Sequence, residues 1–179
     1  AKIKSLTIGA SVTRIEKQAF CRCLLFDVKC KSPEIEFVGE EAFLNCKFEN
    51  VEWLDCIRSI GSKAFYAATF KKVPTFTNLE SVGSKGFYGS AFAKASTMWP
   101  EFVVSKKLRH IEPDAFDRSN LGKFTVDGGN PYFSSSEWPL LLNKNQTCLI
   151  MTAAKWPSLI DFPSTMIRMG PGSIMNSSF

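Results

Sequence analysis

Cysteine and histidine are the residue types in this chain with the greatest capacity for covalent or metal chemistry. The six cysteines are Cys21, Cys23, Cys30, Cys46, Cys56 and Cys148, and His110 is the only histidine. A nucleophilic side chain needs a base beside it, and a structural zinc ion needs four ligands at defined spacings. Cys21 and Cys23 lack the two-residue gap of a zinc or redox motif. We therefore expect no metal site, no cofactor and no enzymatic activity, and we expect His110 to be a surface residue.

A repeated sequence motif determines the secondary-structure elements that position these residues. An apolar residue, three mostly polar residues, a small residue and an aromatic residue recur along the chain. The small residues are Ala19, Ala42, Ala64, Gly86, Ala115 and, in a degenerate copy, Ser173. The first three intervals are 23, 22 and 22 residues. A period of this length is typical of a solenoid, in which each unit buries its apolar side only against its neighbours.

Apolar residues also recur at fixed offsets before each small residue. In the first unit they include Leu6 and Ile8, and their alternation is typical of a strand with one buried face. The small residue and its partner four positions later have the spacing of one helical turn. Each unit is predicted to contain a short strand, a turn, a second extended segment and a single helical turn. Stacking of the units would join the first strands into a parallel sheet.

Two segments interrupt the period. Seven extra residues over 93–99 are expected to bulge as a loop. Between Phe116 and Met169 one unit lacks the repeated motif. There, apolar residues at 140–142 and 148–151 flank a polar segment, which predicts a β-hairpin.

These patterns predict a single solenoid domain over 1–179. We expect regular repeats over about 1–121, an irregular hairpin unit over about 122–155 and a final repeat over about 156–179. The first residues already lie in repeat register, so we expect the chain to be part of a longer array.

Several of these segments resemble a known family. Ile-Gly-Ser-Lys-Ala-Phe-Tyr at 60–66, Val-Gly-Glu-Glu-Ala-Phe-Leu-Asn-Cys at 38–46 and Leu-Thr-Ile-Gly-Ala-Ser-Val-Thr-Arg-Ile at 6–15 are similar to BspA-like leucine-rich repeats. The irregular unit resembles the interrupting hairpin of that family. The resemblance covers nearly the whole chain and implies a leucine-rich-repeat solenoid that is β-rich, with a parallel sheet on one face and short helical or 3-10 turns on the other. It also implies a surface protein associated with adhesion and with binding host or matrix proteins.

Cys23 and Cys46 occupy the same position in successive repeats. Later repeats place Ala68, Ser90 and Ser119 there, which indicates a tight inward position. Neighbouring strands lie about 4.8 Å apart, so the geometry permits a Cys23–Cys46 disulfide. The column of small residues favours reduced thiols that pack as small hydrophobes.

Composition and motifs bear on the compartment and on the partners. The net charge of +5 is spread along the chain without a basic stripe, so we expect no nucleic-acid partner. No apolar run approaches the about 18–20 residues of a membrane span, so we expect no membrane insertion by this segment. Asn145 and Asn176 begin N-glycosylation triplets, which fits a secreted or cell-surface protein.

The outward side of the predicted sheet is the candidate binding surface. Its middle repeats combine apolar residues with charged ones, the usual anatomy of a protein interface. The predicted site consists of Glu52, Leu54, Lys72, Pro74, Phe76, Glu101 and Val103. One alternative stays open, in which Phe76 turns inward and replaces Thr75 in the core.

The sequence therefore predicts a protein-binding module, a cell-surface adhesin-like or receptor domain that recognises host, matrix or partner proteins, or a second copy of itself. The alternative is an intracellular, cytoplasmic leucine-rich-repeat scaffold for protein assembly. That alternative predicts free thiols on all six cysteines and no glycan at Asn145.

Overall fold

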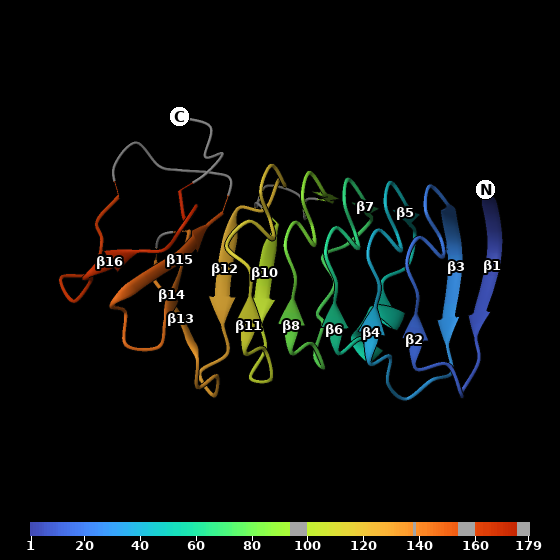
Figure 1. The fold of residues 1–179 in the computed structure, drawn as a ribbon, viewed down its shortest axis with the longest axis horizontal. Helices are drawn as coiled ribbons and strands as arrows, with labels where there is room; N and C mark the ends of the chain where they lie inside the picture. Colours follow the sequence, from blue (N-terminus) through green and yellow to red (C-terminus); the bar gives the residue numbers. More distant parts are fainter. Residues whose placement is uncertain (94–99, 138, 154–159, 175–179) are drawn as a thin grey trace.

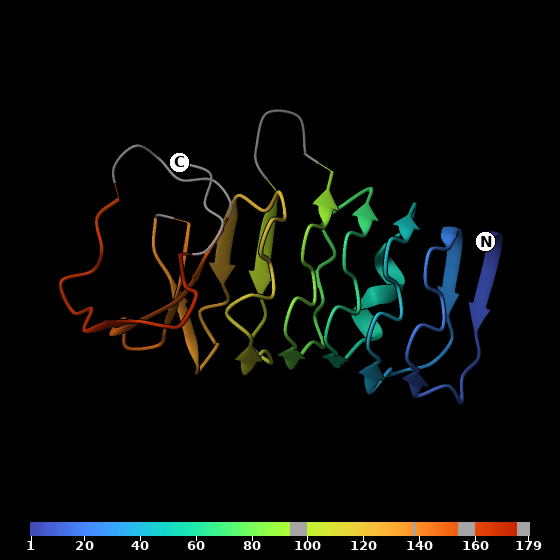
Figure 2. The same ribbon diagram turned by 45° about the horizontal axis from the view of Figure 1, so that its top comes forward.

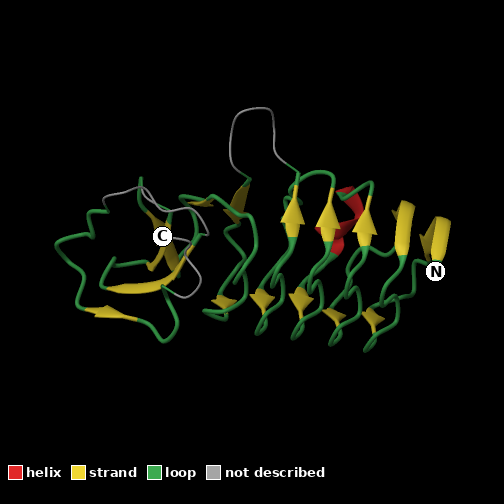
Figure 3. Cartoon of the chain, turned by 90° about the horizontal axis from the view of Figure 1, so that it is seen from above, coloured by secondary structure: helices red, strands yellow, loops and turns green. Residues whose placement is uncertain are grey.

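In a computed structural model that describes residues 1–93, 100–137, 139–153 and 160–174, the chain coils into an elongated solenoid. The N-terminal strands lie at one end and a small mixed sheet lies at the other (Figure 1). Two rows of short strands run along opposite sides of the coil (Figure 3). The predicted leucine-rich-repeat solenoid with parallel sheets is thus confirmed.

The first row contains the predicted first strands of the first, second, fifth and irregular units, together with three two-residue strands that end before the predicted strands of the third, fourth and fifth units. A five-stranded parallel sheet has the order β1-β3-β5-β7-β9, and β10 pairs with β12 in parallel. The members of this row are β1 (Lys2–Ile8), β3 (Leu24–Cys30), β5 (Lys47–Phe48), β7 (Thr69–Phe70), β9 (Ala91–Phe92), β10 (Glu101–Val104) and β12 (Lys123–Val126). The register aligns Leu25, Phe48, Phe70 and Phe92, as the repeat spacing predicts.

The second row contains the predicted second extended segments. It is a parallel sheet in which each strand adds one residue to the core, with the order β2-β4-β6-β8-β11. Its strands are β2 (Arg14–Ile15), β4 (Phe37–Val38), β6 (Ser59–Ile60), β8 (Ser81–Val82) and β11 (His110–Ile111).

The segments around the small residues are hydrogen-bonded turns, and the prediction of a helical turn there is wrong. In the second unit the Ala42 N–H donates to the Gly39 carbonyl (3.2 Å), which is the bond of a tight turn. Positive φ angles at Glu41 (54°) and Asn45 (54°) prevent a continuous helix. The Phe43 N–H instead donates to the carbonyl of Ala64 in the next turn (2.8 Å), so each unit is tied to its neighbour.

Stacked aromatic rings fill the core between the two rows. Phe43 stacks on Phe65 at 5.2 Å and Phe65 on Phe87 at 5.3 Å between ring centroids, and Phe48 stacks on Phe70 at 5.1 Å. These five rings are at most 1% exposed. Burial of large rings is the main favourable term in such a fold, so the phenylalanines act as core residues.

The first row is interrupted in the third and fourth units, where the sequence predicts strands. Residues 71–76 form no strand, and η1 (Glu52–Cys56), a 3-10 helix, occupies the third unit (Figure 2). The Asn50 side chain accepts from the Val28 N–H (3.1 Å) and donates to the Val28 carbonyl (3.0 Å). These bonds replace the ladder that a neighbouring strand would offer to β3.

The irregular unit and the final repeat together form a mixed sheet. Its strands are β13 (Phe133–Ser135), β14 (Leu140–Asn143), β15 (Cys148–Thr152) and β16 (Arg168–Met169). The antiparallel pairing of β14 with β15 confirms the predicted hairpin, and β16 joins β15 in parallel. The expected loop over 93–99 lies outside the described residues beyond Ala93, and the boundaries of the three parts stay predictions.

Candidate functional site

The structure separates the seven predicted binding residues into exposed and buried groups. Glu52 and Lys72 are exposed, Glu101 is half-buried, and Val103 is 42% exposed. Leu54, Pro74 and Phe76 are buried, and the prediction that they face outward is wrong. The other four residues keep their predicted place on the solvent side of the first row.

Leu54 is buried because its unit forms a helix in place of a strand. In a strand, Trp53 and Leu54 would point to opposite faces. In η1 both side chains are buried, and Leu54 has no exposed surface. The Glu52 carboxylate accepts from the Val51 N–H (3.1 Å) at the start of this helix. Hydrogen bonds from backbone N–H groups, followed by the Lys72 ammonium at 3.3 Å, lower the pKa of Glu52.

Phe76 turns into the core, which confirms the alternative that the sequence left open. Its φ of 49° directs the ring inward, where it meets Phe87 at 5.5 Å and Phe102 at 6.0 Å between centroids. Thr75, which the repeat spacing assigns to the core, is exposed instead. The cost of a positive φ at an aromatic residue is offset here by burial of the ring.

A groove of about 280 Å³ surrounds Val103 on the solvent side of the first row. Three successive turns line it, through Thr75, Thr77, Val103, Ser105, Lys106 and Asp127. We call this site the Val103 groove. The sequence predicts Val103 on this face but does not assign Thr75, Thr77 or Lys106 to the binding site. The two threonines could have been identified from the alternative in which Phe76 turns inward, because that turn moves Thr75 and Thr77, on both sides of it, to the surface.

Polar groups in the Val103 groove are only partly satisfied. Asp55 Oδ1 accepts from Thr75 Oγ1 (2.6 Å) and from the Thr77 N–H (3.3 Å), which fixes the threonine side of the groove. Ser105 Oγ has no hydrogen-bond partner, and no ion pair reaches Lys106, within the part of the chain that the structure describes. The groove therefore offers an apolar side chain next to an ammonium group that is free to bind an anionic group.

Acidic residues flank the Val103 groove. The Asp127 carboxylate accepts from the Gly129 N–H (2.8 Å), and Glu101 accepts a hydrogen bond from Thr125 on the neighbouring strand. Both signs of charge therefore lie within the groove and at its edge, as at the polar rim of a protein interface.

Charges on the second row are largely paired between turns. Lys17 contacts Glu40 at 2.7 Å, and this hydrogen bond raises the pKa of Lys17 and lowers that of Glu40. Arg58 contacts Glu80 at 2.7 Å, which raises the pKa of the guanidinium. His110 is exposed, as predicted, and lies 3.0 Å from Glu112. Since these charges already have partners, the second row is the weaker candidate for binding.

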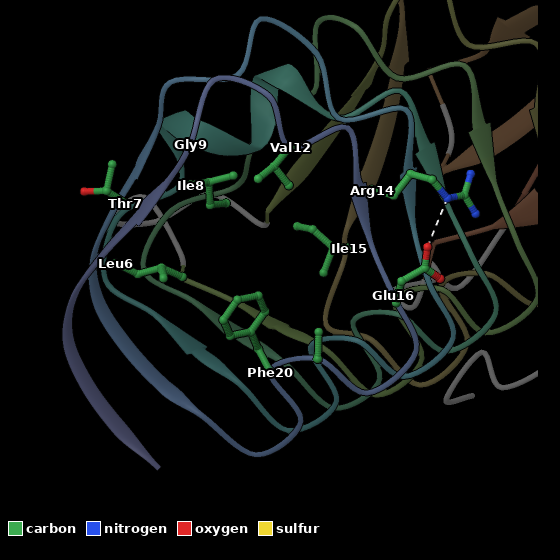
Figure 4. Close-up of a pocket in the computed structure, with 10 residues that line it drawn as sticks. Leu6, Thr7, Ile8, Gly9, Val12, Arg14, Ile15, Glu16 and Phe20 are labelled. Atoms are coloured by element: carbon green, nitrogen blue, oxygen red, sulfur yellow. Dashed lines mark hydrogen bonds and ion pairs between the residues drawn. The ribbon is translucent and has the colours of Figure 1, made fainter.

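A second hollow, of about 310 Å³, opens at the N-terminal end of the coil. Ile8, Ile15 and Phe20 point into it, and an Arg14–Glu16 ion pair of 3.0 Å lies at its rim (Figure 4). On its inner side Phe20 stacks on Phe43 at 5.2 Å. This hollow is the end of the same core that continues through the other turns. The prediction of a longer array stays a prediction.

The predicted modification sites differ in their surroundings. Asn145 is exposed in the turn between β14 and β15, and Asn176 lies outside the described residues. Cys23 and Cys46 are free thiols. Cys46 Sγ donates to the Phe20 carbonyl (2.8 Å), and burial raises the pKa of its thiol to about 12.

Neither a metal-binding cluster nor a membrane-spanning helix is found among the described residues. Among them, no group of three or more histidine, cysteine, aspartate or glutamate residues could hold a metal ion. None of their helices has the length and apolar character needed to cross a membrane.

Comparisons with known proteins identify the repeat. The family model described as the BspA type leucine rich repeat region matches residues 1–121 in six copies. No curated protein matches the chain.

Two solved structures share the fold. One is the pneumococcal vaccine antigen PcpA, with 19% identity, a TM-score of 0.71, and coverage of 95% of this chain and 42% of that one. The other is a leucine-rich repeat protein from Eubacterium ventriosum, with 20% identity, a TM-score of 0.73, and coverage of 93% and 43%. The chain thus spans less than half the length of either protein.

Proposed function

The chain belongs to the BspA-type leucine-rich repeat family, and from that premise we propose that it is a protein-binding module of a cell-surface or secreted protein. Its ligand is a host, matrix or partner protein, and it binds through the first row of strands. The module supplies a shaped surface and performs no catalytic chemistry.

The Val103 groove is the observation that carries this proposal. An exposed aliphatic residue in a hollow, with free and paired charges around it, has the composition of a small protein-binding site. Strand β10 holds Val103, and Ser105 and Asp127 directly follow the paired strands β10 and β12, so a ligand would meet a preorganised surface.

Two observations support placement outside the cell. The pneumococcal protein of similar fold is a vaccine antigen, and Asn145, which begins an N-glycosylation triplet, stands exposed in a hairpin turn. Antibody staining of intact source cells, with surface proteolysis as a check, tests this placement. Staining that proteolysis removes is the expected result. Staining only after permeabilisation would contradict it and favour the cytoplasmic scaffold.

Binding is tested with purified protein and immobilised fibronectin, laminin and collagen as probes. We expect at least one probe to bind, and Val103→Glu to weaken that binding about tenfold or more, because it places a charge in the apolar part of the groove. Ile167→Glu is the matched control, since Ile167 is 83% exposed and directly precedes β16, a strand of the mixed sheet at the C-terminal end of the coil.

The two variants should have the same melting temperature as the unaltered protein, which separates binding from folding. Absence of binding to all three probes would contradict recognition of matrix proteins. Equal weakening by Val103→Glu and Ile167→Glu would contradict the assignment of the site to the Val103 groove.

A further inference from the structure

Two cysteines that the repeat spacing does not bring together meet where the first row is interrupted. Cys30 ends β3 and Cys56 ends η1, and their Sγ atoms are 3.1 Å apart. The two residues are 26 apart in sequence, so they do not share a repeat column. No other pair of cysteines has a sulfur–sulfur contact of this kind among the described residues.

We propose that Cys30 and Cys56 form a disulfide bond that joins the second and third turns of the solenoid. A disulfide has a sulfur–sulfur distance of about 2.05 Å, so closure requires the two sulfur atoms to approach by about 1 Å. Both side chains are half-buried and pack against the edge of the core, which leaves them within reach of a small reagent.

The place of this pair in the sheet gives the bond a structural role. β3 pairs with β5 only through Leu24 and Leu25, and beyond them the Asn50 side chain supplies the hydrogen bonds to Val28. No strand of the third unit continues the ladder as far as Cys30. The disulfide would supply a covalent link at a position where the sheet has no backbone link.

The reaction is an exchange with a low-molecular-weight disulfide such as oxidised glutathione. One protein thiol, as its thiolate, attacks a glutathione sulfur, forms a mixed disulfide and releases one reduced glutathione. The second thiol loses its proton, attacks the protein sulfur of that mixed disulfide and releases the second glutathione. Two protons and two electrons pass from the protein to the reagent, and one sulfur–sulfur bond replaces another.

The surroundings of Cys56 indicate the order of the two attacks. Cys56 Sγ lies 2.9 Å from the Trp53 carbonyl, to which it can donate, and burial raises the pKa of its thiol to about 12. Cys56 is therefore protonated near neutral pH and is a poor first nucleophile. The first attack falls to Cys30, whose Sγ lies 3.1 Å from Cys56 Sγ.

The test uses the purified, reduced chain, folded and then equilibrated with mixtures of oxidised and reduced glutathione. Free thiols are blocked with iodoacetamide in urea, which exposes the buried thiols, and peptides are mapped by mass spectrometry without reduction. We expect one linked pair of peptides, containing Cys30 and Cys56, and alkylation of the other four cysteines. Oxidation should also raise the melting temperature by about 5–10 °C, as expected for a closed loop of this length.

Two variants provide controls. Cys56→Ser should carry glutathione on Cys30 and show no rise in melting temperature, whereas Cys23→Ser should keep both the link and the rise. A predominant Cys23–Cys46 link, or glutathione on Cys30 and Cys56 of the unaltered chain without a link between them, would overturn the proposal. If Cys56→Ser fails to fold, the peptide map of the unaltered chain alone decides between these outcomes.

Discussion

Replacement of Asn130 by alanine is expected to break the junction between the regular repeats and the hairpin unit. Asn130 has no exposed surface and lies between β12 and β13. Its Nδ2 donates to the carbonyls of Ser105 (2.7 Å) and Leu108 (2.8 Å). Its Oδ1 accepts from the N–H groups of Tyr132 (2.7 Å) and Phe133 (2.8 Å). One side chain therefore satisfies four backbone groups on two successive units.

The size of the effect follows from those four groups. A buried polar group that loses its only partner costs about 1–3 kcal/mol. Tyr132 is half exposed, so water can replace part of what its N–H loses, and the Ser105 carbonyl keeps a second donor, the Leu108 N–H (3.2 Å). The Leu108 carbonyl and the Phe133 N–H therefore account for most of the loss. We expect Asn130→Ala to lower the free energy of unfolding by about 3–5 kcal/mol, a large share of the stability of a domain.

Urea unfolding followed by circular dichroism measures this loss, and Asn130→Asp makes the test sharper. That substitution keeps the acceptor for Tyr132 and Phe133 but turns a carboxylate toward the Ser105 and Leu108 carbonyls. Below the raised pKa of this buried carboxyl, the protonated group can donate to one carbonyl. Stability should therefore be higher at acidic pH and fall as pH rises through that pKa. Asn145→Ala, in an exposed turn, is the control. If Asn130→Ala lowers the free energy of unfolding by less than about 1 kcal/mol, the contribution assigned to these four hydrogen bonds is refuted.

Three further predictions concern the core, the turns and the thiols. Leu54→Asp should lower the free energy of unfolding by about 3 kcal/mol or more, because it buries a charge, whereas Val103→Asp should have little effect in the same urea assay. Gly39→Ala should lower the melting temperature, since its Cβ would lie 2.7 Å from a backbone nitrogen of the preceding turn, and Gly9→Ala, with nothing within 4 Å, should not. The raised pKa of Cys46, about 12, means that the folded state retains a proton that the unfolded chain releases above about pH 9. Stability should then fall by about 1.4 kcal/mol per pH unit between those values for this thiol, and a Cys46→Ala variant with an equal slope would contradict the assignment.

The repeated motif is sufficient to predict most of the fold. Its period predicts both rows of strands, because residues one period apart must lie on neighbouring rungs. Its aromatic position predicts the stack from Phe20 to Phe116. The turns were harder to predict, since the spacing of four residues fits a helical turn as well as two successive tight turns. The positive φ angles that decide between them occur mostly at ordinary residues such as Glu41, and among the described residues a glycine takes such a turn position only at Gly89 and Gly172.

The candidate site could be predicted only in part, because two of its units depart from the rule of alternation. That rule holds while the backbone stays extended, and it fails at Leu54, where η1 buries two successive residues. It fails again at Phe76, whose ring finds more contact in the core than the Thr75 side chain could make. Both outcomes depend on packing between units, which no single unit reveals.

The same departures create the features that we assign to function. A continuous first row would place a strand in each unit and leave an even surface above the core. Because residues 71–76 of the fourth unit form no strand, Phe76 enters the core and Thr75 and Thr77 reach the surface, where they form one wall of the Val103 groove. Because η1 replaces the strand of the third unit, Cys56 meets Cys30. Regular repeats therefore supply the rigid coil, and the two irregular units supply its binding surface and its proposed crosslink.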